Sequence, residues 1–363
     1  MVAIVEVPPP TSADDPNAWA AMADTTLWSA ETFDQLGYED LNDPIETAAS
    51  LAVPSSNRRT LRWVALDDAD DHTTVVGSCT CSLTLRDNLG TAGVHAVVRP
   101  DRRRQGIGTA LFDAAEQRAA AEGRHTVQSW VLQAARTRAD DPGALAPREG
   151  SGFVDGNHAS ARFLLGRGYS LEQVEVHSLL RVPLPAAVID PLESDAAAAS
   201  ESSYRLIAWA DRCPDDIVDG LAEVRAAMAD APIAGLDFER QHWSADRVRE
   251  VEQRWADAGV TTLATAAQHV ETGELAGYTE LIRFVTKADS AIQEDTVVIA
   301  AHRGHRLGMR LKTANLRLMA KRWPRVRRVH TWNADENDYM RSINIALGFR
   351  PESSEGGWQK VLG

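Results

Sequence analysis

Apolar residues recur along the chain with two alternating periods, one typical of strands and one typical of helices. Strand-like apolar runs occur in two sets of three, at 61–66, 75–85 and 93–98, then at 261–266, 275–284 and 296–300. A stripe with helical period follows each set, over 109–121 and 309–321; in the second, Leu311, Ala314 and Leu318 lie at i, i+3 and i+7. Strands that alternate with helices predict an α/β or α+β fold.

The two halves of the chain repeat the same order of signals. In each half, the third apolar run leads into a basic turn that contains glycine, and the helical stripe, another strand-like run and a short helix follow. Gly108 lies 200 residues before Gly308, and Gly168 lies 180 residues before Gly348. The difference falls in a polar, Pro/Gly-rich insertion at 135–157. A repeated order with one loop insertion predicts a duplicated fold.

The length and the middle of the chain indicate where the two domains meet. A chain of 363 residues exceeds the size at which a single core usually stops growing. The segment 183–203 contains three prolines, a run of four alanines and several serines, which favours a linker. We therefore expect domains at 1–185 and 204–363, joined by a linker at 186–203.

Charge and composition narrow the classes of partner. The net charge of −14 disfavours binding to nucleic acid, because phosphate backbones repel an acidic protein, and it favours a cationic substrate. No apolar run approaches the length of a membrane span, and the N-terminus lacks a signal-peptide pattern. The three cysteines have no partners at metal-ligand spacing. We expect a cytoplasmic protein that binds no metal and no membrane. A homodimer is possible, and the sequence does not decide whether it forms.

Each basic turn stands between a strand and the start of a helix. The first turn contains Arg103, Gly106 and Gly108, and the second contains Arg303 and Gly308. Free N–H groups at a helix start bind phosphate, and glycine lets the backbone approach a ligand closely. The turns lack the Gly-Lys-Ser/Thr of a Walker loop and the third glycine of a dinucleotide fingerprint. The pattern therefore indicates a different kind of phosphate-binding turn.

Both turns resemble the pyrophosphate loop of the GNAT superfamily of N-acetyltransferases, whose pattern is Gln/Arg-x-x-Gly-x-Gly/Ala. The first turn matches fully, whereas Arg306 replaces the first glycine in the second turn. The pairs Gly168-Tyr169 and Gly348-Phe349 are similar to the end of the last helix in that superfamily. The tandem layout is similar to that of mycothiol synthase and of the tandem acetyltransferases of actinobacteria.

The resemblance implies two tandem GNAT-like domains, each a mixed central sheet with splayed parallel strands and flanking helices. It implies acetyl-CoA as a co-substrate, with the pantetheine arm between the splayed strands and the pyrophosphate at the turn. The implied contacts in the second half are Val298, Ile299, Ala300, Arg303, Gly304, His305, Arg306, Leu307, Gly308, Met309, Asn333 and Asn337. Those in the first half are Val97, Val98, Arg103, Arg104, Gln105, Gly106, Ile107, Gly108 and Thr109.

Candidate catalytic groups favour the second half. Asn333 and Asn337 follow its fifth strand, where the superfamily often has an asparagine that contacts the cofactor; they could equally be turn and capping residues. No asparagine directly follows Trp130 in the first half. Glu280 and Asp295 are the candidate general bases. His302 is expected to face phosphate or solvent.

The tyrosine that protonates the departing thiolate in many relatives is missing. Its place holds Leu164 in the first half and Asn344 in the second. Tyr339 lies nearby and is a candidate substitute; alternatively, the thiolate leaves without a dedicated acid, or through water.

Two functions follow from these observations. The first is an acetyl-CoA-dependent N-acetyltransferase in which a small amine attacks the thioester directly in a ternary complex. The alternative is a non-catalytic acyl-CoA-binding or scaffold protein with degenerate sites, which the missing tyrosine and Arg306 favour. Two retained strand–turn–helix units favour the enzyme. No motif identifies the amine.

Overall fold

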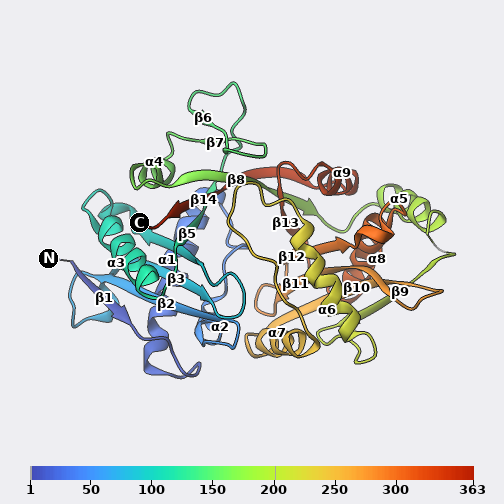
Figure 1. Cartoon of the computed structure of the whole chain (residues 1–363), viewed down its shortest axis with the longest axis horizontal. Helices are drawn as coiled ribbons and strands as arrows, with labels where there is room; N and C mark the ends of the chain where they lie inside the picture. Colours follow the sequence, from blue (N-terminus) through green and yellow to red (C-terminus); the bar gives the residue numbers. More distant parts are fainter. Residues whose placement is uncertain (1, 201) are drawn as a thin grey trace. The chain divides into compact units, whose positions relative to one another are not determined.

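The computed structural model describes residues 2–200 and 202–363, and these form two compact units. Unit 1 contains the residues up to Glu175, together with Ile233–Glu239 and Ser353–Gly363, and unit 2 contains Val176–Pro232 and Arg240–Glu352. Each unit has a mixed sheet with helices on both faces, which confirms the predicted fold class (Figure 1).

Unit 1 has the strand order β1-β2-β3-β4-β5-β14-β8. Leu61 and Trp63 of β2 pack with Leu111 of α3, whereas Val64 packs with Ala20 of α1, so the alternation along β2 places the two helices on opposite faces. Its elements are β1 (Ala3–Val7), α1 (Trp19–Leu36), α2 (Ile45–Ala52), β2 (Arg58–Leu66), β3 (Val75–Thr84), β4 (Thr91–Val98), α3 (Ile107–Ala121), β5 (Thr126–Gln133), the hairpin β6 (Ala144–Leu145) and β7 (Val154–Asp155), α4 (Ala159–Gly166), and parts of β8 (Ser170–Arg181) and β14 (Arg350–Val361).

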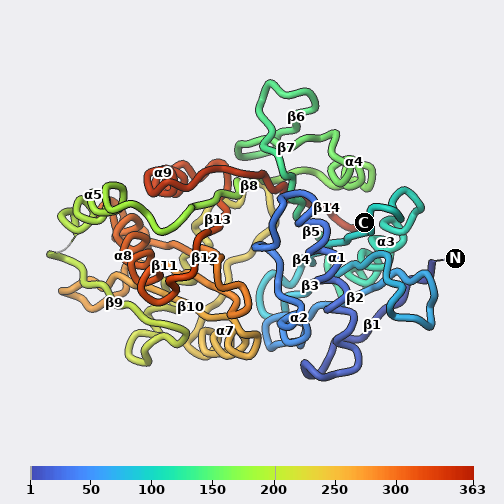
Figure 2. The backbone as a smooth tube through the Cα atoms, turned by 180° about the vertical axis from the view of Figure 1, so that it is seen from behind, coloured from blue at the N-terminus to red at the C-terminus, as the bar shows by residue number. Residues whose placement is uncertain are grey.

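Unit 2 has the strand order β8-β13-β12-β11-β10-β9, with β9 at one edge (Figure 2). Leu263 of β10 packs with Met309 of α8, whereas Ala264 packs with Leu221 of α6, so α8 and α6 cover opposite faces. Its elements are α5 (Ala186–Ala198), β9 (Tyr204–Ala210), α6 (Val218–Ala226), α7 (Ala245–Asp257), β10 (Val260–His269), β11 (Leu275–Phe284), β12 (Ser290–Val298), α8 (Leu307–Arg322), β13 (Arg328–Ala334), α9 (Asp338–Leu347), and the remaining parts of β8 and β14.

The segment expected to be a linker, 186–203, is helical over most of its length. Helix α5 spans Ala186–Ala198 and contains Pro191. Ile189 and Ala196 lie seven residues apart on one stripe of the helix, and both are buried in the core of unit 2. Because alanine has the highest helix propensity, the four-alanine run extends a packed helix instead of forming a flexible connection.

The end of the chain also departs from the expected domain boundaries. The last residues of β14 pair antiparallel with β5, from Ser354 opposite Gln133 to Val361 opposite Thr126. Trp358 is fully buried and belongs to the hydrophobic core of unit 1. The burial of this large apolar side chain stabilises the C-terminal segment in the sheet of unit 1.

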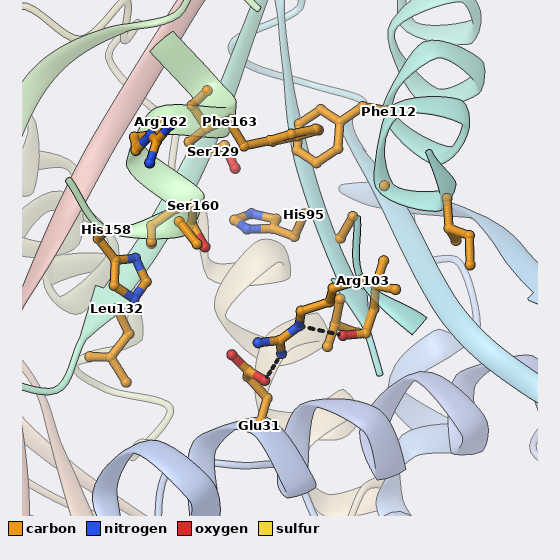
Figure 3. A pocket seen from close by; sticks show the side chains of 18 of the residues that line it. Glu31, His95, Arg103, Phe112, Ser129, Leu132, His158, Ser160, Arg162 and Phe163 are labelled. Atoms are coloured by element: carbon orange, nitrogen blue, oxygen red, sulfur yellow. Dashed lines mark hydrogen bonds and ion pairs between the residues drawn. The ribbon is translucent and has the colours of Figure 1, made fainter. Parts of the chain in front are cut away.

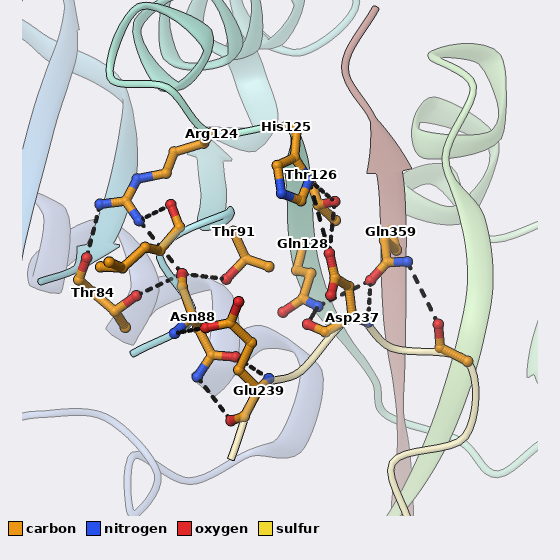
Figure 4. A network of polar contacts seen from close by, with 12 residues as sticks. Thr84, Asn88, Thr91, Arg124, His125, Thr126, Gln128, Asp237, Glu239 and Gln359 are labelled. Atoms are coloured by element: carbon orange, nitrogen blue, oxygen red, sulfur yellow. Dashed lines mark hydrogen bonds and ion pairs between the residues drawn. The ribbon is translucent and has the colours of Figure 1, made fainter. Parts of the chain in front are cut away.

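A second segment of the later half, Ile233–Glu239, is a strap held to unit 1 by polar contacts (Figure 4). The Glu239 carboxylate accepts a hydrogen bond from the Asn88 backbone N–H at 2.8 Å. The Asp237 carboxylate accepts a hydrogen bond from the Thr126 hydroxyl at 2.9 Å. The backbone N–H of Asp237 donates a hydrogen bond to the Gln359 side chain at 2.7 Å. Unit 1 therefore contains two segments that a linear division of the chain assigns to the second domain.

No helix in the described part of the chain is long and apolar enough to span a membrane.

Candidate functional site

The parallel strand pair in each unit separates part-way along its length. Strands β4 and β5 pair from Thr91 opposite Thr126 to Gly93 opposite Gln128, where their ladder ends. In unit 2, β12 and β13 pair only from Ser290 opposite Arg328 to Ile292 opposite His330. Beyond these points, the facing strand edges present backbone N–H and C=O groups that a ligand can pair with. The resemblance to the GNAT superfamily predicted such a separation of the two parallel strands.

The turns after these strands have the same backbone conformation, built from different residues. Arg104 and Gly106 have positive φ in the first turn, at 62° and 81°. Gly304 and Arg306 have positive φ in the second, at 86° and 55°. The two left-handed positions coincide, and each turn fills one with glycine and the other with arginine. The replacement of glycine by Arg306 therefore leaves the shape of the second turn intact.

Each turn ends at a helix start that is open to a ligand. Neither α3 nor α8 has a side-chain N-cap, so the first N–H groups of both helices stay available to an anion. A Cβ atom added at Gly106 would meet nothing within 4 Å, which shows open space above the first turn.

The first arginine of each turn folds back onto the preceding strand. The Arg103 Nε–H donates to the Val98 carbonyl at 2.9 Å, and the Arg303 Nε–H donates to the Val298 carbonyl at 3.3 Å. Arg103 also pairs with Glu31 of α1. Both arginines were predicted to contact the cofactor. In the structure, each one also links its turn to the end of the preceding strand.

A cavity of about 680 Å³ lies between the splayed strands of unit 1 (Figure 3). Its walls include α1, β4, the turn, α3, β5 and α4. Apolar side chains on these walls include Phe112, Val131 and Leu164. The buried Nδ1 of His158 has no hydrogen-bond partner within the described chain, so a ligand can satisfy it. The sequence-predicted contacts on these walls are Val97, Val98, Arg103, Arg104, Gly106, Ile107, Gly108 and Thr109, whereas Gln105 does not line the cavity.

Two residues of this cavity escaped the sequence analysis. His95 of β4 lines it, and loss of hydration, with the charge of Arg58, lowers the pKa of His95 to about 4, so the imidazole is neutral at pH 7. Asn157 also lines it and lies twelve residues before Tyr169, as Asn337 lies before Phe349. That equal spacing could have identified Asn157 from the sequence, whereas nothing local distinguishes His95.

In unit 2, the two carboxylates predicted as bases are already engaged. Glu280 forms a buried ion pair with Arg225 at 2.9 Å, and Asp295 accepts a hydrogen bond from the Tyr278 hydroxyl. Burial raises the pKa of Glu280, while Arg225 opposes that shift. In this arrangement both carboxylates already have a side-chain partner.

A β-bulge on β12, the splayed strand of unit 2, places a third carboxylate, that of Glu294, next to Asp295 in the sequence and opposite Glu280. Thr279 pairs with Thr296, but Leu281 pairs with Gln293, so Glu294 and Asp295 together oppose the single residue Glu280. Glu294 keeps an exposed side chain. Incomplete hydration nevertheless raises its pKa to about 7, and the carboxylates of Asp295 and Glu280 add to the shift. Strand β4 of unit 1 pairs without such a bulge.

Three further predicted residues of unit 2 lie on β13 and at the start of α9. Asn337 caps α9, because its side chain accepts a hydrogen bond from the Met340 N–H at 3.2 Å. Asn333 accepts a hydrogen bond from the Asn344 side chain at 2.6 Å. Tyr339 is 59% exposed, and its hydroxyl lies 4.0 Å from the position of a Cβ added at Gly308. A hydroxyl beside the second turn is compatible with a cofactor contact as well as with an acid.

Comparison with known proteins agrees with this geometry. Residues 22–141 match the family model of the acetyltransferase (GNAT) family. A tandem GNAT protein from the clavulanic acid biosynthesis pathway superposes with a TM-score of 0.72 and 25% identity, over 99% of each chain. The family match lies within unit 1, and the fold of the whole chain is similar to that of a tandem GNAT protein.

Two further structures share the fold at lower identity. A GCN5-related N-acetyltransferase from Sphaerobacter thermophilus has a TM-score of 0.57 and 15% identity, over 99% of this chain and 95% of that one. A glucosamine N-acetyltransferase region of a fungal β-N-acetylglucosaminidase has a TM-score of 0.58 and 13% identity, over 99% of this chain and 38% of that one. No curated protein matches the chain.

Proposed function

We propose that the protein is an acetyl-CoA-dependent N-acetyltransferase for a small amine, and that unit 2 performs the transfer with Glu294 as the general base. The bulge on β12 carries this proposal, because it brings a solvent-accessible carboxylate with a pKa near neutrality to the splayed strand. A base is most effective when its pKa lies close to the working pH.

Both units have the features that acetyl-CoA requires. The uncapped starts of α3 and α8 would hold the pyrophosphate, and the free edges of β4 and β12 would pair with the amides of the pantetheine arm. The cavity of unit 1 has room for such an arm. When bound, acetyl-CoA supplies an acetyl group activated as a thioester.

The residues of unit 2 then have separate tasks. Glu294 takes the proton of the ammonium group, so that the neutral amine can attack. Asp295 adds negative charge to that side of the strand, which attracts a cationic acceptor. The ion pair of Glu280 with Arg225 holds the neighbouring strand β11 to α6. Backbone N–H groups of β12 beyond the bulge are the candidate donors to the developing oxyanion.

A second candidate places the transfer in unit 1. His95 lines the cavity there and is neutral, and one of its ring nitrogens is engaged by the Trp130 backbone, which leaves the other to accept a proton. The non-catalytic alternative remains a third outcome, in which the clefts bind acyl-CoA without turnover.

Substitution of the two candidate bases separates these outcomes. We expect Glu294→Gln to lower kcat by about 10² to 10⁴-fold with acetyl-CoA and a panel of amines. In the wild type, kcat should rise with pH through about 7 as Glu294 loses its proton, and the variant should lose that rise. The exposed Glu271→Gln is the matched control and should leave kcat unchanged.

The opposite pattern would move the reaction to unit 1. If His95→Gln abolishes turnover while Glu294→Gln spares it, Glu294 is not the base. If calorimetry detects acetyl-CoA binding but no amine is acetylated, the protein is a binding module instead.

A further inference from the structure

Three positions that are apolar in unit 1 are polar in unit 2. The correspondence follows from the repeated sequence: Lys312 comes four residues after Gly308, Asn333 follows Trp332, and Asn344 comes four residues before Gly348. The strand registers agree, because Val127 pairs with Ala92 and Val329 with Ala291, three residues before the respective tryptophans. The counterparts in unit 1 are Phe112, Val131 and Leu164, which all line its cavity.

These polar side chains leave hydrogen-bonding capacity unused. The Asn344 amide donates to Asn333 at 2.6 Å, but the Asn344 Oδ1 is buried and has no hydrogen-bond partner among the residues that the structure describes. Lys312 is 2% exposed, and its Nζ lies 5.8 Å from the centre of the Phe349 ring. Within the described residues, the Lys312 ammonium has no hydrogen-bond or ion-pair partner.

A buried ammonium without a counter-ion is costly, so a neutral amine is favoured in its place. Loss of hydration alone lowers the pKa of Lys312 to about 7, and no charged group of the surrounding elements contributes to the shift. Lys312 therefore exchanges its proton near neutral pH, and an anion that formed beside it would be strongly stabilised.

We propose that Lys312 donates the proton that the CoA thiolate takes as it leaves unit 2. This inference rests on the proposed function. Asn344 stands where the resemblance to the family places a tyrosine, and Lys312 occupies the position of Phe112, which lines the cavity of unit 1 together with Leu164, the counterpart of Asn344. A lysine on α8 thus supplies the acid that the last helix lacks.

The step balances as follows. The amine nitrogen forms the new bond to the acetyl carbon, the C–S bond breaks, and its electron pair stays on sulfur. The thiolate takes a proton from the Lys312 ammonium and leaves as the thiol. Glu294 first passes the ammonium proton to solvent, and it then takes the second proton that the nitrogen loses as the amide forms. Solvent then returns a proton to Lys312 and removes one from Glu294.

A change of the leaving thiol distinguishes a general acid from a residue that only maintains the structure. With acetyl-CoA, Lys312→Met should lower kcat by about 10²-fold, within the range for loss of a general acid. With an acetyl thioester of an acidic aryl thiol, which departs without protonation, the loss should shrink to less than about threefold. Lys321→Met, an exposed position on the same helix, is the control and should match the wild type with both thioesters.

Binding of CoA itself supplies a readout that does not depend on turnover. The Lys312 ammonium should stabilise the CoA thiolate in the wild type, visible as thiolate absorbance in the ultraviolet at pH 7.5, and Lys312→Met should remove it. S-methyl-CoA should bind equally to both proteins. Equal kcat losses with both thioesters, or thiolate absorbance that survives in Lys312→Met, would overturn the assignment. If the wild type shows the thiolate but acetylates no amine, the proposed function fails, and Lys312 is then a thiolate-binding residue and not a general acid.

Discussion

At the scale of single residues, the two turns show how one backbone shape accepts different side chains. Each turn needs two left-handed residues, and each has one glycine and one arginine there. Arginine in this conformation costs about 1 to 2 kcal/mol relative to glycine, because its Cβ crowds the following carbonyl. Both turns therefore carry backbone strain. It lies at the first left-handed position, Arg104, in one turn and at the second, Arg306, in the other.

Exchange of these residues should reveal the strain. We expect Arg306→Gly to stabilise unit 2 by about 1 kcal/mol, which corresponds to a rise of about 2 to 4 °C in its melting temperature. Gly106→Ala should destabilise unit 1 by a similar amount, since nothing within 4 Å would clash and only φ is unfavourable. Differential scanning calorimetry measures both. A lower melting temperature for Arg306→Gly would show that the arginine side chain contributes more than the strain costs.

At the scale of elements, strand β14 determines whether the sheet of unit 1 is complete. Its last residues lie beside β5, and Trp358 contributes a fully buried indole to the core. Sheet and core therefore both depend on residues from the end of the chain.

Truncation of that indole should weaken unit 1 selectively. We expect Trp358→Ala to lower the free energy of unfolding of unit 1 by about 3 to 5 kcal/mol, as for other large-to-small core substitutions. Val361→Ala, at a position that is 71% exposed on the same strand, should change it by less than about 0.5 kcal/mol. Urea unfolding followed by amide exchange distinguishes the units. Equal effects of the two substitutions would contradict the role of Trp358 in the core.

At the scale of the whole molecule, each compact unit takes residues from both halves of the chain. Unit 1 includes Ile233–Glu239 and Ser353–Gly363, and unit 2 includes the end of β8 and all of α5. A cut in the turn after α5 therefore separates residues that belong to one core.

We expect fragments 1–199 and 202–363 to be poorly folded when they are produced separately. When they are produced together, they should associate and regain native circular dichroism, because each supplies strands that the other needs. Size-exclusion chromatography and circular dichroism test this. Two fragments that each fold alone with protected sheet amides would restore the simple division at 185–204 that the sequence suggested.

The sequence by itself determined the features that depend on neighbours along the chain. Strand period, glycine and arginine in a turn, and an apolar helical stripe are local signals, so both strand–turn–helix units could be predicted from them. The splayed strands were expected only because the turns resemble those of the GNAT superfamily. The repeated order of strand, turn and helix, interrupted by one insertion, indicated the duplication. The equal spacing from Asn157 to Tyr169 and from Asn337 to Phe349 contained the signal for Asn157.

Only the tertiary structure decided which partners the candidate groups meet. Arg225 and Tyr278 engage Glu280 and Asp295, and an extra residue in β12 brings Glu294 to the splayed strand instead. The membership of β14 in unit 1 likewise depends on pairing with β5, more than 200 residues earlier. Ion pairs, strand registers and burial join residues that are distant in the chain, and no local pattern encodes which partner a side chain meets.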